Sequence, residues 1–453
     1  MKIPHFDRLV WAALAVLGLA LAIILIIFNK SGVSIVKAYP LDGTQIGPWG
    51  KVGVEFGQAM VKDLTEKVFK ITPEIAGQFQ WDGKTLWFEP REPFKAGGNY
   101  SASVTSGAPG TDGRKLKKNF SWKFTIRSPS LIYISPAQEG SDLWYKDVGT
   151  GNPQKLTDTA NAVQDFAVSR DGETIAYTLL NDQNGADIWL MPRDGTNHTL
   201  LLNCGSDQCS QPAWSWNSDR IAFSRKSRKN GPNSAFNAPR VWTIEVTSGQ
   251  SAPLFQDASI TGDSPNWSPE GKYLAFYDTA HQSFHVLNLQ NSKDTLLQTQ
   301  IDQVIAWSPD GNQLLFVNEL STGEQSYLSV YSYDMTRGQG GEPFKDSLAG
   351  LDASIPDWSA DGQSVVLGLR SLEGGQSKQL WVLGFKQEPP VDVTDNQIYT
   401  QAAYHWNNQG TAIVYQRFEL GRSDSQPEVL VWDKATHQSQ VIAQNAALPA
   451  WLP

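Results

Sequence analysis

The sequence predicts an all-β protein in which a β-sandwich is followed by a larger β-propeller. Glycine and aromatic residues are plentiful, with 38 Gly and 17 Trp, and only 18% of the residues are charged. This composition is typical of short strands joined by tight turns. Several segments alternate apolar and polar residues with period two. A tryptophan-centred motif also recurs at intervals of 40 to 53 residues, and such a period is typical of propeller blades.

The net charge of −9 is unevenly distributed along the chain. Residues 31–128 hold 14 Lys and Arg against 9 Asp and Glu, whereas residues 129–453 hold 20 against 36. An acidic larger domain argues against nucleic acid as a partner, because phosphate backbones attract basic surfaces. The simpler interpretation of the acidity is that it keeps a large surface soluble.

Residues 1–30 are predicted to be a cytoplasmic tail and a transmembrane signal anchor. Leu9 to Phe28 is an uncharged run of 20 residues. As a helix it would span about 30 Å, the thickness of the hydrocarbon core of a bilayer. Lys2 and Arg8 favour a cytoplasmic N-terminus. This interpretation predicts a single-pass protein of the cell membrane with its bulk outside the cytoplasm, and a cleaved signal peptide is the alternative.

Residues 33–128 are predicted to form a β-sandwich. Apolar and polar residues alternate in Val52–Phe56, Tyr100–Val104 and Phe120–Ile126, as they do in strands with one buried face. Asp-Gly and Gly-Gly pairs punctuate the segment as turns. Short, evenly spaced strands over a segment of this length are typical of a sandwich.

The order of landmarks in this segment is more specific. Pro40-Leu41-Asp42-Gly43 comes first, Trp87-Phe88-Glu89-Pro90 and Phe94 to Tyr100 follow, and Trp122-Lys123-Phe124-Thr125 closes it. The pattern resembles the bacterial Ig-like domain of surface-layer and other cell-envelope proteins. Gln58-Ala59 departs from the Ser/Thr-x-Pro that the family usually has there, which affects only a turn. The resemblance implies a spacer or adhesion-type module without chemistry of its own.

Residues 129–453 are predicted to be the propeller, because one motif recurs through them. A clear copy is Trp307-Ser308-Pro309-Asp310-Gly311, which leads into the apolar run Leu314-Leu315-Phe316. The Trp ends an inner strand and packs between blades, Asp-Gly makes a tight turn, and the apolar run is a strand buried on both faces. The residues at the Trp position, here called the blade anchors, are Val168, Trp214, Trp267, Trp307, Trp358, Trp406 and Trp451.

The anchors predict seven blades, with six as the alternative. The strands from Leu131 to Thr157 have no inner strand before them, and the inner strand at Trp451 is followed only by Leu452-Pro453. Joining these halves completes one blade and removes the open edge of the ring. The motif resembles the WD40-like repeat of TolB-type proteins, whose own domain has six blades. The resemblance implies a protein-binding platform. The same repeat also supplies the propeller of several serine peptidases, in which a hydrolase domain follows it.

Cysteines and histidines are the candidate metal ligands. Cys204 and Cys209 suit a disulfide in an exported protein, with free thiols or a metal site as the alternatives. His281 and His285 flank a predicted strand at a spacing that would place them on one face. The sequence shows no carboxylate or third histidine to accompany them, so we expect no metal and no cofactor.

One loop is a candidate for contact with a partner. The longest hairpin insertion of the repeats contains Arg225, Lys226, Arg228 and Lys229. Long loops often carry function. The alternative interpretation is a solvated loop tip.

The motifs of common active sites are missing from the sequence, including the nucleophile elbow, the zinc-protease motif and the phosphate-binding loop. We therefore expect no catalytic residues, and a non-enzymatic, membrane-anchored interaction or scaffold protein. The propeller would be presented on the Ig-like spacer to another envelope protein. The alternative is a sensor or binder of a small ligand or glycan in the propeller channel. A third hypothesis is a lyase or hydrolase built on channel loops, since fold alone does not decide function.

Overall fold

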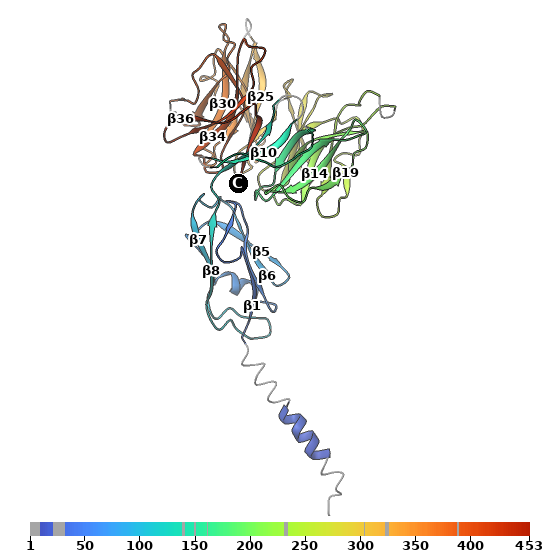
Figure 1. Cartoon of the computed structure of the whole chain (residues 1–453), viewed down its shortest axis with the longest axis vertical. Helices are drawn as coiled ribbons and strands as arrows, with labels where there is room; N and C mark the ends of the chain where they lie inside the picture. Colours follow the sequence, from blue (N-terminus) through green and yellow to red (C-terminus); the bar gives the residue numbers. More distant parts are fainter. Residues whose placement is uncertain are drawn as a thin grey trace, which may run out of the picture. The chain divides into compact units, whose positions relative to one another are not determined.

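The computed structural model describes residues 10–20, 32–137, 141–148, 151–160, 162–230, 234–302, 304–321, 326–386 and 389–453. The chain divides into two compact units, Met1–Arg127 and Ser128–Pro453. Both units are built mainly from β-strands, some of which are labelled in Figure 1.

The first unit contains two four-stranded sheets around one core. The first sheet has the order β1 (Ile35–Tyr39), β3 (Val52–Phe56), β6 (Thr85–Pro90), β5 (Gly77–Asp82). The second has the order β2 (Thr44–Ile46), β8 (Phe120–Ile126), β7 (Asn99–Val104), β4 (Phe69–Thr72). A short helix, α2 (Lys62–Glu66), precedes β4. Alternate residues of both sheets, such as Val54, Leu86 and Phe124, are buried in one hydrophobic cluster, so the period-two pattern correctly placed β3, β7 and β8.

The second unit is propeller-like. Its strands form successive groups in which paired strands run antiparallel, with one parallel pair between two groups, at Ala186 and Gln208. The first group contains β12 (Val163–Val168), β13 (Thr174–Leu180), β14 (Ala186–Pro192) and β15 (Thr199–Leu202). The second contains β16 (Gln208–Trp214), β17 (Arg220–Lys226), β18 (Arg240–Glu245) and β19 (Ser251–Pro253). The third contains β20 (Asp263–Trp267), β21 (Tyr273–Asp278), β22 (Ser283–Asn288) and β23 (Asp294–Gln298). The fourth contains β24 (Ala306–Trp307), β25 (Gln313–Ser321), β26 (Ser326–Asp334) and β27 (Gln339–Gly341). The fifth contains β28 (Leu351–Ala353), β29 (Asp357–Trp358), β30 (Ser364–Ser371), β31 (Gln379–Gly384) and β32 (Val391–Asp392). The sixth contains β33 (Tyr399–Trp406), β34 (Ala412–Glu419), β35 (Glu428–Asp433) and β36 (Gln438–Gln444).

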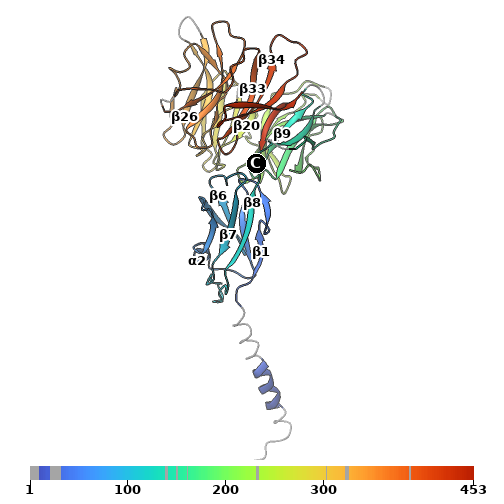
Figure 2. The ribbon, with the colours of Figure 1, turned by 60° about the vertical axis from the view of Figure 1, so that its left-hand side comes forward.

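The remaining group joins the two ends of the unit. It has the order β11 (Gln154–Lys155), β10 (Asp142–Asp147), β9 (Ser130–Ser135), β37 (Ala447–Leu452). Trp451 lies opposite Leu131 in this ladder, as expected from the sequence. The junction of β37 with β9 is called the seam below, and β9 is labelled in Figure 2. The side chain of Leu452 is fully buried with Ile132 and Leu143.

Four of the six tryptophan anchors link neighbouring groups by hydrogen bonds, whereas the indole N–H groups of Trp307 and Trp406 are buried without a partner among the described residues. Each indole N–H that bonds in this way donates to the carbonyl of the residue just before the anchor of the preceding group. The pairs are Trp214 to Ala167 at 3.1 Å, Trp267 to Ala213 at 3.1 Å, Trp358 to Ala306 at 3.2 Å and Trp451 to His405 at 2.9 Å. The anchor Val168 has no side-chain N–H to donate. The bond from Trp451 joins β37 to β33 of the preceding group, so the split group is linked in the same way as the groups of Trp214, Trp267 and Trp358.

The serine or asparagine after each of the first six anchors holds the following turn. Ser308 is buried, its hydroxyl donates to Asp310 Oδ1 at 2.6 Å, and it accepts the N–H of Gln313 at 2.9 Å. Ser359 makes the same two bonds, to Asp361 and from Ser364. The glycine that follows the Asp of the motif turns the backbone at positive φ, 67° at Gly311. A side chain would be strained in this conformation. The Trp-Ser-x-Asp-Gly motif therefore encodes both the packing between groups and the turn.

We expect Ser308→Ala to destabilise the second unit by about 1–3 kcal/mol, because a buried N–H and a carboxylate lose their partner. Denaturant unfolding measures the change. Ser347→Ala, at an exposed serine, is the control and is expected to leave the midpoint unchanged. Equal midpoints for the two variants would contradict this role for Ser308.

The single-pass localisation predicted from the apolar run Leu9 to Phe28 is wrong. Within the described part of the chain, no helix is long and apolar enough to cross a membrane. Leu9 and residues 21–28 lie outside the described residues.

Candidate interaction surface

The antiparallel order of strands sorts the loops of the second unit onto two faces. Turns between first and second strands, and between third and fourth strands, share one end, here called the turn face. The opposite end, here called the loop face, holds the loops between second and third strands and the connections from each group to the next. The second-to-third loops that the structure describes completely are 181–185, 279–282, 372–378 and 420–427. Residues 227–230 and 234–239, between β17 and β18, also lie on the loop face.

The predicted contact loop is braced by Arg228. Its guanidinium donates three hydrogen bonds to backbone carbonyls, of Ser206 at 3.0 Å, Ser234 at 2.7 Å and Asn184 at 2.7 Å. It also lies 3.6 Å from the ring centre of Phe236. These carbonyls belong to the loop itself, to the preceding second-to-third loop and to the connection between the two groups. One side chain therefore fixes three segments of the loop face.

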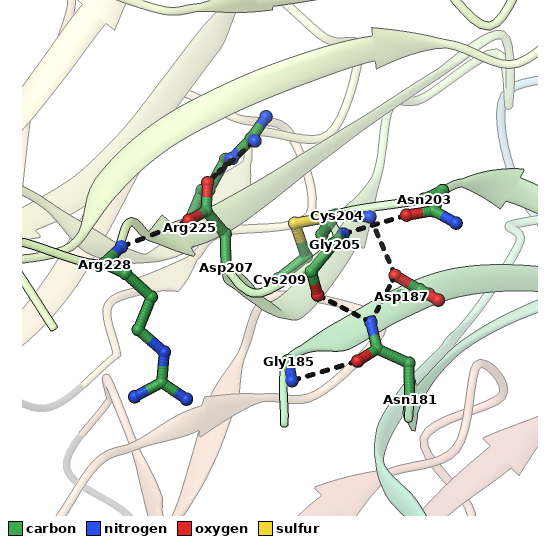
Figure 3. Close-up of a disulfide and its surroundings, with 10 residues drawn as sticks. All are labelled: Asn181, Gly185, Asp187, Asn203, Cys204, Gly205, Asp207, Cys209, Arg225 and Arg228. Atoms are coloured by element: carbon green, nitrogen blue, oxygen red, sulfur yellow. Dashed lines mark hydrogen bonds and ion pairs between the residues drawn. A yellow bond between two sulfur atoms is a disulfide. The ribbon is translucent and has the colours of Figure 1, made fainter. Parts of the chain in front are cut away.

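A disulfide closes the neighbouring connection. Cys204 and Cys209 are bonded to each other, and Figure 3 shows the polar groups around them. Asp207, in the closed turn, forms an ion pair with Arg225 at 2.8 Å and accepts the backbone N–H of Arg228 at 3.1 Å. On the other side, Asp187 accepts the N–H of Cys204 at 2.7 Å. The disulfide turn and the long loop are thus one connected structure.

The four cations of the predicted contact loop have different surroundings. Arg225 and Lys226 end the strand β17 rather than lying in the loop. The guanidinium groups of Arg225 and Arg228 are engaged within the protein, so these two residues act as braces. Lys229 is exposed and Lys226 half-exposed. For these two lysines, contact with a partner stays a prediction.

We expect Arg228→Ala to speed amide hydrogen exchange at residues 227–230 and 234–239 by about tenfold or more. Hydrogen bonds from a charged group contribute about 1.5–3 kcal/mol, and local opening sets the exchange rate. Lys229→Ala, one residue away and exposed, is the matched control. Unchanged exchange in Arg228→Ala would show that the loop is held by something else.

The inner strands share a bulge that the sequence did not reveal. Gln211, Ser264, Ala403 and Leu448 all have positive φ, between 45° and 54°. Each lies three residues before its blade anchor, where the ladder to the second strand is interrupted. A bulge changes the direction in which the side chains beside it point. Side chains of the inner strands can therefore reach neighbouring groups at this position.

Polar side chains at this position link three successive groups. Asp165 Oδ2 accepts the N–H of Gln211 at 2.7 Å, and the Gln211 amide bonds both ways with Ser264, at 3.1 and 2.9 Å. Burial raises the pKa of Asp165. Burial also raises the pKa of Asp263, and the charge of Asp302 adds to this. The fixed offset from the anchor is the signal that could have identified these residues.

The histidine pair has carboxylate partners, contrary to the sequence interpretation. The fully buried Asp278 pairs with His281 Nδ1 at 2.7 Å, and His285 Nδ1 pairs with Asp294 at 2.7 Å. Burial by itself would raise the pKa of Asp278, but hydrogen bonds from Thr261 and His281 hold it below its usual value. The residues that the structure describes contain no group of three or more His, Cys, Asp or Glu arranged to hold a metal. The sequence did not reveal the carboxylate beside His285, because Asp294 lies on the next strand, β23.

The fold and surface define an all-β protein with an Ig-like domain and a propeller-like domain. The chain belongs to the TolB beta propeller domain family, whose model matches residues 113–339. A bacterial Ig-like domain model matches residues 29–126. These matches confirm the two family resemblances seen in the sequence. No curated protein matches the chain.

Among solved structures, the acylaminoacyl peptidase of Pyrococcus horikoshii is similar with a TM-score of 0.50 and 11% identity, over 76% of this chain and 50% of that one. TolB from Acinetobacter baumannii has a TM-score of 0.43 and 13% identity, over 93% and 99% of the two chains. Dipeptidyl peptidase 4 of Porphyromonas gingivalis has a TM-score of 0.43 and 12% identity, over 77% and 51%. At these identities the likeness concerns the fold alone.

Proposed function

We propose that this protein is a non-enzymatic interaction scaffold that binds a protein partner through the loop face of a seven-bladed ring. The seven blades are the six groups from β12 to β36 and the group joined at the seam. The observation that carries the proposal is the bracing of the long loop by Arg228 and the disulfide turn. A loop held in one conformation loses little entropy on binding, which favours affinity.

Both chain ends of the second unit lie on its turn face, which leaves the loop face for a partner. Strand β9 begins there and β37 ends there, as the antiparallel order requires. Arg193, in a third-to-fourth turn, bonds the carbonyl of Pro453 and the hydroxyl of Ser130. The partner we propose is a folded protein, and the envelope partner expected from the sequence stays a prediction.

Site-specific photocrosslinking in the organism that makes the protein tests this function. A crosslinking amino acid at Lys229, on the loop face, is expected to capture one defined protein. The same probe at Gln290, exposed on the turn face, is the matched control. Capture from Lys229 is expected to weaken when Arg228→Ala is added, because the loop loses its brace. Equal capture from both positions, or none from Lys229, would contradict the proposal.

A second candidate function has a specific observation in its favour. The chain Asp165–Gln211–Ser264 places hydrogen-bonding groups along the inner strands, where a small ligand of the channel would meet them. Thermal shift of the wild type against Gln211→Ala, screened with sugars and peptides, tests it. Stabilisation of the wild type alone would favour channel binding over the scaffold function.

A further inference from the structure

The outer face of the first sheet of the Ig-like domain carries a row of aromatic residues. Tyr39 on β1 lies opposite Gly53 on β3, Gly53 lies opposite Trp87 on β6, and Trp87 lies opposite Gln80 on β5. Residues opposite each other in a ladder point to the same face. The neighbours Val52, Val54, Leu86 and Phe88 are buried in the core, so this row points away from the core.

Gly53 lets the indole of Trp87 lie against the sheet. A Cβ at position 53 would come within 2.6 Å of a ring carbon of Trp87, far inside van der Waals contact. The ring centres of Tyr39 and Trp87 are 4.8 Å apart, with their planes tilted by 42°. Both side chains are half-buried, as expected for rings that rest one face on the sheet. Tyr39 and Trp87, with Gly53 between them, are called the aromatic platform below.

Polar residues flank the platform on both sides. One neighbouring row holds Lys37, opposite Glu55, which is opposite Thr85. The other holds Glu89, which pairs with Lys51 at 2.5 Å and accepts a hydrogen bond from Gln78 at 3.2 Å.

The row of Lys37 ends at Asp82, which lies opposite Thr85, so this row has one positive and two negative side chains, whereas the other row has one of each. Lys37 and Glu55 share one row, and Lys51 and Glu89 share the other. The Lys37 ammonium also lies 4.5 Å from the ring centre of Tyr39. The excess of carboxylates repels an anionic ligand, and the ammonium over Tyr39 repels a cationic one. These charges therefore favour a neutral ligand that has an apolar face and many hydroxyl groups.

We propose that the aromatic platform is a binding site for a neutral glycan. A pyranose ring has a face of C–H groups, which suits the electron-rich face of an aromatic ring. Its equatorial hydroxyls then point sideways toward the flanking rows. The row from β1 to β5 crosses four strands, about 14 Å at 4.8 Å per strand, which accommodates two to three sugar units. This site gives the Ig-like domain a function of its own, separate from the loop face of the propeller.

Isothermal titration of the full chain with cellotetraose, maltotetraose, chitotetraose and trigalacturonate tests the site. We expect at least one of the three neutral sugars to bind, and the anionic trigalacturonate to bind at least tenfold more weakly. Trp87→Ala is expected to weaken the bound sugar at least tenfold, and Trp87→Phe less. Lys70→Ala, on the exposed side of β4, is the matched control and leaves affinity unchanged.

A second variant, at the edge of the platform row, tests the site even if Trp87→Ala does not fold. Gln80 is exposed and lies at the edge of the platform row, so Gln80→Ala is expected to fold normally and to weaken binding several-fold. Binding that survives both substitutions would overturn the proposal, as would the failure of all three neutral sugars to bind. A change of oligomeric state in Trp87→Ala without sugar binding would instead assign the platform to a second copy of the chain, which also overturns it.

Discussion

Removing residues 447–453 is expected to abolish the cooperative unfolding of the second unit. The deletion removes β37, which supplies the edge partner of β9 and the buried side chain of Leu452. It also removes the bond from Trp451 to His405 of the preceding group. Truncation of a buried Leu or Trp costs about 2–5 kcal/mol, and a domain has about 5–15 kcal/mol in total. The loss of both residues and their ladder therefore approaches the whole stability of the unit.

Calorimetry of the deletion variant measures this effect. The exposed edge of β9 is also expected to promote association between molecules. A synthetic peptide of residues 445–453, added in excess, is the control, because it restores the missing strand in trans and should restore the transition. A deletion variant that keeps the midpoint of the full chain would contradict a closed ring.

The second large effect is expected at Trp358. This anchor is 9% exposed, stacks on Phe385 with ring centres 4.6 Å apart, and donates its indole N–H to Ala306 of the preceding group. Trp358→Ala should lower the free energy of unfolding by about 3–5 kcal/mol. Trp358→Phe keeps most of the packing and should lose about 1 kcal/mol with the hydrogen bond. Denaturant unfolding of both variants measures the two contributions.

Hydrogen exchange distinguishes a link between groups from ordinary packing. The indole of Trp144 donates to Ser135, within its own sheet, so Trp144→Phe is the matched control. Trp358→Phe should speed exchange in the preceding strands β24 and β25, and Trp144→Phe should not. Identical exchange in those strands would mean that the indole bond of Trp358 does not couple the groups.

The sequence could predict the features that one stretch of chain encodes. At Trp307 and Trp358 the Trp-Ser-x-Asp-Gly motif carries the anchor, the hydroxyl that holds the turn and the glycine at positive φ within five residues, so these copies can be recognised by themselves and the weaker copies by their spacing from them. The seam was also accessible, because an unmatched inner strand at Trp451 complements the unmatched strands after Leu131.

Features that depend on distant residues could not be predicted. Arg228 was assigned to a contact loop, but its guanidinium bonds carbonyls at Asn184 and Ser206, and no local pattern marks a backbone acceptor. Asp294 reaches His285 from another strand in the same way. The platform of Trp87 depends on Gly53, which is 34 positions away in the chain and adjacent only through the register of β3 and β6.

Hydrogen exchange of the full chain, read at residues 447–452, tests the closed ring most directly. Terminal segments normally fray and exchange fast. If β37 completes the sheet of β9, its amides should exchange only when the whole unit unfolds, at the same rates as those of β33 to β36. Exchange of residues 447–452 within seconds, while β33 to β36 stay protected, would contradict the closed seven-bladed ring on which the proposed loop face depends.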